Sequence, residues 1–209
     1  YKKFPLVNSS IVFLNTLSLE IPVFFLAKYF SMEMVGLYML ANRISVIPMS
    51  LFGTSVTKVY FQKATDTFNH KPEQLLNVYK KTVQRLAGIG LVPFLSIFLF
   101  APFFMKLIFG NEWQFSGVII QILAIGMFMQ FTTSPISTTF TIMNKQEIAL
   151  YLTIVSLAVR FGSMYFFRSD IESVFWALTL STALFYLVYN LFIYRIILLE
   201  IRKNEKKCF

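Results

Sequence analysis

Six stretches of the chain are almost continuously apolar, and each is long enough to cross a bilayer as a helix. Spanning the hydrocarbon core takes about 20 predominantly apolar residues in helical form. Backbone groups in lipid must pair within their own segment, and long runs such as Leu91–Met105 lack the alternation of barrel strands. The pattern predicts an all-α integral membrane protein, a single bundle of six transmembrane helices at about residues 6–30, 35–61, 86–109, 116–143, 148–167 and 174–199.

The longest connection, about residues 62–85, has a helical pattern of its own after Pro72. Its basic residues lie mostly on a different face from its apolar residues. We therefore expect an amphipathic helix at the membrane surface that runs into the third span. The apolar positions that recur at helical spacing are Leu75, Leu76, Tyr79, Val83 and Leu86.

Basic residues fall on alternate sides of the six predicted spans. Cytoplasmic segments of membrane proteins carry an excess of Lys and Arg. With a cytoplasmic N-terminus, the outer side receives only Lys28, Lys106 and Arg168 of the 19 basic residues, and Arg43 and Arg160 lie within spans. The pattern predicts that both termini are cytoplasmic. The basic residues on the predicted cytoplasmic side are Lys2, Lys3, Lys58, Lys63, Lys71, Lys80, Lys81, Arg85, Lys145, Arg195, Arg202, Lys203, Lys206 and Lys207.

Composition agrees with a membrane environment. Hydrophobic residues make up 56% of the 209 residues and charged residues 14%, against about 25% charged in typical globular chains. The net charge of +9 lies mainly between and after the spans, which indicates contact with anionic lipid rather than nucleic acid. The single cysteine, Cys208, and the single histidine, His70, exclude an intrachain disulfide and a cysteine metal cluster.

Three ionisable residues fall at membrane depth, where such residues usually face water or a partner. Arg43 and Arg160 lie within reach of the outer headgroups, so each either extends its side chain to the surface or lines a cavity. Glu20 lies too deep to reach the surface. It is therefore a buried ion-paired or protonated carboxyl, or a cavity residue that pairs with Arg43 or binds a coupling proton or sodium ion.

Uncharged polar residues extend this pattern. Asn15 in the first span and Gln130 in the fourth are candidate cavity residues, and the run Thr132–Thr139 is polar enough to line water. The alternative for that run is interhelical packing by small hydroxyl residues. Prolines inside the spans, such as Pro22 and Pro135, tend to kink helices, which suits a transporter that alternates between two openings.

A catalytic set is missing from the sequence. No paired carboxylates occur within a span, and there is no phosphate-cradling glycine-rich loop. We therefore expect a transporter rather than an enzyme, without a metal or organic cofactor and with possible coupling to protons or sodium ions.

Several strings resemble the polysaccharide flippases, the O-antigen and teichoic-acid type exporters of the multidrug/oligosaccharidyl-lipid/polysaccharide superfamily. The first is Val35–Arg43, followed by Pro48 and by Val59–Phe61 ahead of a charged loop. Further on, Phe109–Trp113 between two spans, with Gly117, Ile122–Ala124 and Ser134–Pro135, is similar to the same family. The resemblance covers about residues 4–145.

The resemblance implies a protein of two helical bundles around a central cavity, of which this chain is the second. Such a protein moves undecaprenyl-diphosphate-linked oligosaccharide across the bacterial inner membrane for O-antigen, lipopolysaccharide, capsule or teichoic-type synthesis. The expected partners are the bilayer, the lipid-linked oligosaccharide and the N-terminal lobe of the same protein, because the chain begins at Tyr1 rather than Met. The resemblance implies cationic cavity residues for the anionic substrate, and the matching position is Arg43. Arg160 and Lys28 are candidates by their chemistry alone, and the uncharged Asn42 is a further candidate cavity residue.

Other functions remain open at this point. A drug or metabolite exporter of the same superfamily, coupled to cations, would prefer acidic cavity residues, of which Glu20 is the one candidate. A membrane subunit or scaffold without transport of its own is a second alternative. A membrane glycosyltransferase or ligase is disfavoured because the chain has no large extramembrane loop.

Overall fold

The computed structural model describes residues 3–205, and this part of the chain is helical with no strand. Lys2, Lys206, Lys207 and Cys208, which the sequence places on the cytoplasmic side or in the tail, lie outside the described residues. The helices are α1 (Lys3–Tyr29), α2 (Met32–His70), η1 (Pro72–Gln74), α3 (Leu75–Phe109), η2 (Asn111–Trp113), α4 (Gln114–Thr133), η3 (Pro135–Thr138), α5 (Thr139–Ile142), α6 (Gln146–Phe166) and α7 (Ile171–Glu205).

The turns between the long helices use residues suited to tight reversals. Ser31 caps α2 by accepting a hydrogen bond from the Met34 backbone N–H, at 3.3 Å. Gly110 ends α3 with φ +99°, a conformation that disfavours residues with a Cβ. Asp170 precedes α7, and hydrogen bonds from the Ser173 N–H and hydroxyl hold the pKa of its carboxyl below its usual range.

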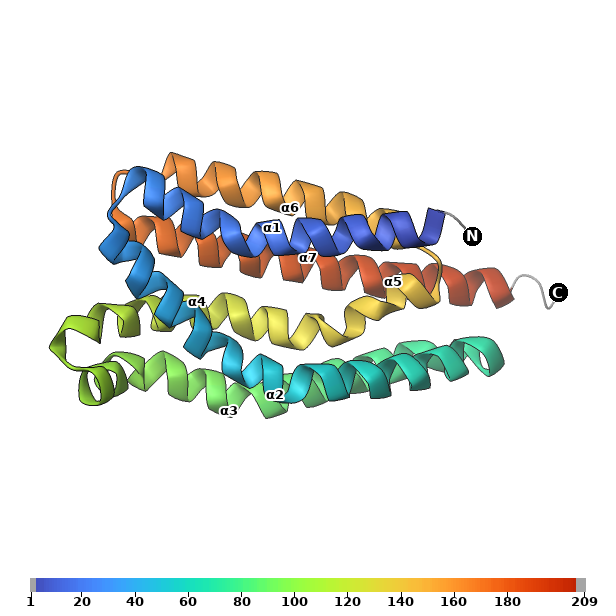
Figure 1. Ribbon diagram of the computed structural model, residues 1–209. Coiled ribbons are helices and arrows are strands. Elements are labelled where there is room, and N and C mark those ends of the chain that lie inside the picture. The colour runs from blue at the N-terminus through green and yellow to red at the C-terminus, as the bar shows by residue number, and fades with distance from the viewer. Residues whose placement is uncertain (1–2, 206–209) are drawn as a thin grey trace.

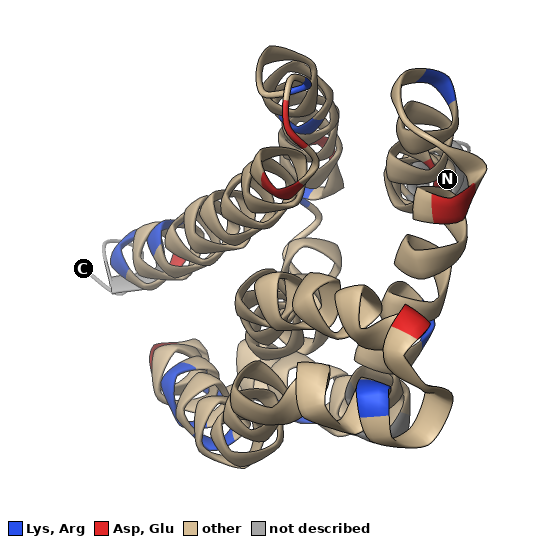
Figure 2. Cartoon of the chain, turned by 90° about the vertical axis from the view of Figure 1, so that its left-hand side faces the viewer, with Lys and Arg blue, Asp and Glu red and all other residues tan. Residues whose placement is uncertain are grey.

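Four helical segments are long and apolar enough to span a membrane within the described residues: Pro72–Phe109, Asn111–Ile142, Gln146–Phe166 and Ile171–Lys203. The helices α1 and α2 are long enough as well, with 27 and 39 residues, but polar side chains interrupt their apolar stretches. The predicted all-α membrane class is thus confirmed, and the predicted count of six spans is supported for four. Figure 2, which looks along the bundle, shows scattered Lys, Arg, Asp and Glu positions on ribbons that are otherwise uncharged.

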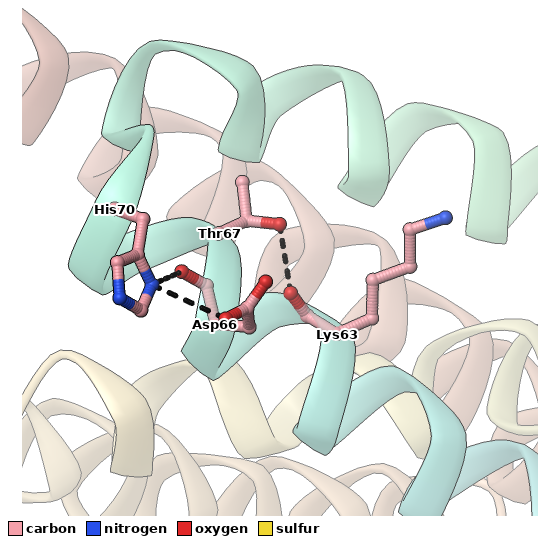
Figure 3. Close-up of polar contacts among 4 residues, drawn as sticks. All are labelled: Lys63, Asp66, Thr67 and His70. Carbon is pink, nitrogen blue, oxygen red and sulfur yellow. Dashed lines mark hydrogen bonds and ion pairs between the residues drawn. The ribbon is translucent and has the colours of Figure 1, made fainter.

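The connection predicted at residues 62–85 is helical on both sides of a short turn: the expected helix after Pro72 runs into the third span as α3, and the second span extends further than predicted. The helix α2 continues to His70, where the His70 Nδ1 lies 3.0 Å from the Asp66 backbone oxygen and 3.2 Å from its carboxylate (Figure 3). After a short 3-10 turn, α3 starts at Leu75. The expected apolar face of this segment is confirmed because Leu75, Tyr79 and Leu86 are buried.

The fourth predicted span is not one α-helix. The helix α4 ends at Thr133, a 3-10 turn follows over Pro135–Thr138, and α5 adds a final turn. Pro135 has no N–H to continue the ladder and its ring clashes with the preceding turn, which explains the break. Interrupted helices of this kind are tolerated in membranes where they lie against protein or a cavity.

The helix α4 occupies the centre of the bundle and packs against α3, α7 and α2. The helix α1 instead packs on α6 and α2, so α1 and α6 form a pair beside the inner helices (Figure 1). One apolar core lies among α1–α4, α6 and α7 and includes Leu26, Ile119 and Phe175, while a second includes Phe140 and Ile193. The first and last described helices begin and end at the same end of the bundle.

The helices α3 and α4 approach closely at Gly117. A Cβ on Gly117 would overlap the Cα atom of Pro102 and lie 2.7 Å from its nitrogen. Replacing Gly117 by alanine should therefore destabilise the protein by about 1–3 kcal/mol, since backbone atoms must move. Gly88→Ala is the matched control because nothing lies within 4 Å of its Cβ, and it should be neutral or stabilising. Thermal unfolding in one detergent measures both, and equal midpoints would contradict this packing.

Candidate functional site

A polar pocket of about 190 Å³ lies where the outer pair α1 and α6 faces the inner helices α4 and α7. A smaller pocket of about 50 Å³ shares four of its residues, Ser18, Leu19, Gln130 and Arg160, and continues toward α2. We call the two together the Arg160 pocket. The larger part is lined by Asn15, Ser18, Leu19, Gln130, Ser134, Ser137, Thr153, Ser156, Arg160, Phe185, Tyr186 and Tyr189.

Arg160 is the one buried cation in the described part of the chain, with 8% of its surface exposed. Its Nη1 donates a hydrogen bond to the Ser18 backbone oxygen at 3.1 Å, which ties α6 to α1. Its Nε is buried and has no hydrogen-bond partner among the described residues. No described carboxylate lies within 4.0 Å of the guanidinium. The site therefore holds a positive charge that the described chain does not neutralise.

This arrangement is costly for a structural role. Burying an unpaired charge in a low-dielectric interior costs several kcal/mol of folding free energy, even after the protein relaxes around it. Intramembrane arginines therefore usually pair, reach a headgroup or face a water-filled cavity. Arg160 does not reach the surface, and it lines both parts of the pocket. An anion in the pocket would supply the missing charge and a partner for the free Nε.

The break in the fourth span supplies one wall of the pocket. Ser134 and Ser137, on either side of Pro135, both line it. Two other hydroxyls of the run contact neighbouring helices instead. Thr133 Oγ1 accepts a hydrogen bond from Asn190 Nδ2 at 2.5 Å, and Thr139 Oγ1 lies 2.6 Å from Tyr60 Oη. The two interpretations of the run Thr132–Thr139 therefore apply to different residues. Ser134 and Ser137 line the pocket, whereas Thr133 and Thr139 form hydrogen bonds with neighbouring helices.

The structure brings four of the predicted site residues together. Asn15, Gln130 and Arg160 line the larger pocket, and Asn42 lines the smaller one with Gln130 and Arg160. These positions come from α1, α2, α4 and α6, so the site is built by tertiary packing rather than by one motif. Their roles in binding stay predictions.

Three other predicted site residues lie outside this pocket. Arg43 and Glu20 are exposed, and Lys28 is exposed with its Nζ 5.4 Å from the Tyr29 ring centre. The predicted pairing of Glu20 with Arg43 is not seen: both residues are exposed, and no ion pair joins them among the described side chains. Ion coupling at Glu20 and substrate contact at Arg43 and Lys28 stay predictions.

Sequence analysis missed several residues that line the pocket. Ser18, one turn before Pro22 in α1, offers its backbone oxygen to Arg160. Tyr186 and Tyr189 on α7 also line the pocket. The isolated hydroxyls Thr153 and Ser156 precede Arg160 by two turns and one turn of the helix, and that spacing on one face of α6 was the available signal.

The described residues contain no group of three or more His, Cys, Asp or Glu side chains close enough to hold a metal ion. The polar groups of the Arg160 pocket are instead one guanidinium, amides, hydroxyls and phenols. Such a set donates hydrogen bonds and suits an oxyanion such as a phosphate.

Comparison with known proteins places the chain in a family. The model of a family described as "Polysaccharide biosynthesis protein" matches residues 3–119, more than half of the chain. A Klebsiella pneumoniae protein described as an "Uncharacterized membrane protein in cps region" is 24% identical over 153 residues, 73% of this chain and 31% of that protein. The chain thus corresponds to about a third of that relative's length. No solved structure matches the chain significantly. The family resemblance predicted from the sequence is confirmed, and the chain belongs to the polysaccharide biosynthesis protein family of membrane proteins.

Proposed function

We propose that the protein moves undecaprenyl-diphosphate-linked oligosaccharide across the bacterial inner membrane, with the Arg160 pocket as the site that receives the diphosphate. The observation that carries this proposal is the buried Arg160 guanidinium, which lacks a carboxylate partner among the described residues and lines a polar pocket. A diphosphate crossing a low-dielectric region needs a forked donor of this kind. The polyprenyl tail can remain in the bilayer.

The proposed topology has six membrane spans, with α1 and α2 as the first two. Both helices exceed the roughly 20 residues that cross the hydrocarbon. Six crossings return the chain to its starting side, in agreement with the two ends of the described chain lying at one end of the bundle (Figure 1). The distribution of basic residues favours the cytoplasm for that side.

The exposed surfaces of the helices suggest where a second lobe would lie. The helices α3, α6 and α7 expose mainly large apolar residues, such as Val92, Ile154 and Leu184, which suit lipid. The helices α1 and α2 expose polar residues among the apolar ones, including Asn15, Glu20 and Arg43. Polar groups at membrane depth need water or protein beside them. We therefore assign the face of α1 and α2 to a central cavity shared with the N-terminal lobe.

Deleting the gene and following the lipid-linked oligosaccharide tests this function. A membrane-impermeant glycosidase is added to right-side-out and inside-out vesicles prepared from cells with and without the protein. We expect cells without it to accumulate intact lipid-linked oligosaccharide that the enzyme reaches only in inside-out vesicles. Complementation with the wild-type gene should restore its exposure in right-side-out vesicles.

The same experiment separates the competing functions. Loss of a glycosyltransferase would leave the oligosaccharide short or absent rather than accumulated. Loss of a scaffold subunit, or of an exporter of other compounds, would leave intact oligosaccharide exposed on the outer side. Either outcome would contradict flipping by this protein.

A further inference from the structure

A second, basic groove of about 550 Å³ runs between α2 and α3, on the hairpin that these helices form around the turn at Lys71. It shares no residue with the Arg160 pocket. Three cations line it: Lys63 from α2, and Lys81 and Arg85 from α3. No Asp or Glu is among the described residues that line it. The groove is therefore positive and is not neutralised by its own walls.

The three cations are exposed, and their side chains form no hydrogen bond or ion pair with the described part of the chain. The nearest acidic residue on α2, Asp66, is held by His70 instead, at 3.2 Å. Figure 3 shows the Lys63 side chain extending away from that pair. The positive charge of the groove is thus available to a ligand.

The groove is amphiphilic along its length. The helices α2 and α3 run antiparallel from the turn, so Lys63 and Lys81 lie at similar distances from it, and Arg85 lies about one turn of α3 further along. Beyond them the walls are apolar, with Val56 on α2 and Ile89 on α3. From Lys81 to Ile89 is about 12 Å along the helix axis at 1.5 Å per residue. A ligand with a charged head and an apolar tail matches this order.

The groove also lies where a membrane surface is expected. The helix α3 has 35 residues and is about 50 Å long, well beyond the roughly 30 Å of the hydrocarbon core. Its second half exposes Val92, Leu95 and Leu99 at 50% or more and suits lipid, whereas its first half carries the basic residues. The first half therefore extends out of the hydrocarbon and places the groove at the headgroup level.

We propose that the α2–α3 groove is a binding site for an anionic phospholipid of the surrounding bilayer. The phosphate lies among Lys63, Lys81 and Arg85, and one acyl chain follows Val56, Val59 and Ile89 toward the bilayer centre. Basic pockets between transmembrane helices bind lipid headgroups by this combination of charge and apolar contact. The site is separate from the proposed transport pocket and does not depend on its function.

Native mass spectrometry of the purified protein in neutral detergent tests the site, with phosphatidylglycerol and phosphatidylcholine of identical acyl chains as probes. We expect wild-type protein to retain phosphatidylglycerol at least about tenfold more tightly than phosphatidylcholine, given roughly 1 kcal/mol per basic residue. The triple variant Lys63→Gln, Lys81→Gln, Arg85→Gln should lose this preference. Inorganic phosphate at the same phosphate concentration should not displace the lipid, which separates a headgroup site from a free phosphate site.

The matched control removes the same charge from the same hairpin outside the groove, with Lys58→Gln, Lys71→Gln and Lys80→Gln. These residues are exposed and do not line the groove. The control should keep the preference for phosphatidylglycerol within about twofold, because one bound headgroup contacts only nearby charges. If both triple variants lose the preference for phosphatidylglycerol equally, net charge alone attracts the lipid and the proposal is wrong. If wild-type protein retains phosphatidylglycerol and phosphatidylcholine equally, the proposed site is also contradicted. Unchanged elution in size-exclusion chromatography confirms that each variant is folded.

Discussion

Arg160→Gln is expected to lower the outward movement of lipid-linked oligosaccharide at least about tenfold without lowering the stability of the protein. Hydrogen bonds to charged groups contribute about 1.5–3 kcal/mol, and 1.4 kcal/mol corresponds to tenfold in rate. The diphosphate would lose both the charge and the free Nε of Arg160. Right-side-out vesicles with an impermeant glycosidase measure the rate.

The stability half of this prediction distinguishes a site residue from a structural one. A guanidinium that is 8% exposed and lacks a carboxylate partner among the described residues costs free energy in the folded protein. Glutamine removes that cost, and its amide can still donate a hydrogen bond toward the Ser18 carbonyl. The thermal unfolding midpoint should therefore stay the same or rise. A fall of several degrees together with lost transport would assign Arg160 to the fold instead.

Two further variants complete the comparison. Arg160→Lys keeps the charge but loses the planar fork, so we expect an intermediate transport rate. Arg168→Gln removes the same charge just beyond the end of α6, where the side chain is exposed and stacks on Tyr165 at 4.3 Å from the ring centre. It should transport like wild-type protein. Equal losses in Arg160→Gln and Arg168→Gln would contradict a specific role for the pocket.

Gln130→Glu is expected to have the second largest effect, again a loss of at least about tenfold in transport. Gln130 and Arg160 line both parts of the pocket, so the new carboxylate is placed in the same confined space as the guanidinium. A carboxylate near Arg160 supplies an internal counterion that competes with the diphosphate and repels it. The change adds no volume, so the packing of α4 is retained.

The control for this variant is Gln121→Glu. Gln121 lies on α4 nine residues before Gln130, which is half a rotation around the helix, and it lines neither part of the pocket. It carries the general cost of a carboxylate at membrane depth without changing the site. When the transport rate is divided by the amount of protein in the membrane, we expect Gln121→Glu to retain a higher rate than Gln130→Glu. Wild-type transport in Gln130→Glu would show that the substrate does not enter this pocket.

The helical bundle could be predicted because its signal is local. Apolar runs of about 20 residues specify helices in a membrane whatever their neighbours are. The break at Pro135 is harder to predict, because a proline inside a span can either kink the helix or end it, depending on the surrounding packing. The sequence predicts a connection at residues 62–85 because charged residues end the apolar run there, although α2 continues as a helix to His70.

The site itself could be predicted only as a set of unusual residues. Sequence shows that Arg43 and Arg160 both lie within spans, but not which of them is enclosed. The rotation of each helix decides this: Arg160 faces α1 and is buried, while Arg43 faces outward. Asn15 and Gln130 meet Arg160 through packing between α1, α4 and α6, which no spacing along the chain encodes. Ser18 contributes a backbone oxygen, so its side-chain type gave no signal.

A comparison of diphosphate binding with and without Arg160 tests the anion-accepting pocket most directly. Purified wild-type and Arg160→Gln proteins are titrated in neutral detergent with undecaprenyl diphosphate and with undecaprenol, which has the same tail and no charge. We predict that wild-type protein binds the diphosphate at least about tenfold more tightly than the alcohol, and that Arg160→Gln binds the two alike. Equal affinity of the wild-type protein for both lipids, or an undiminished preference in Arg160→Gln, would contradict the account.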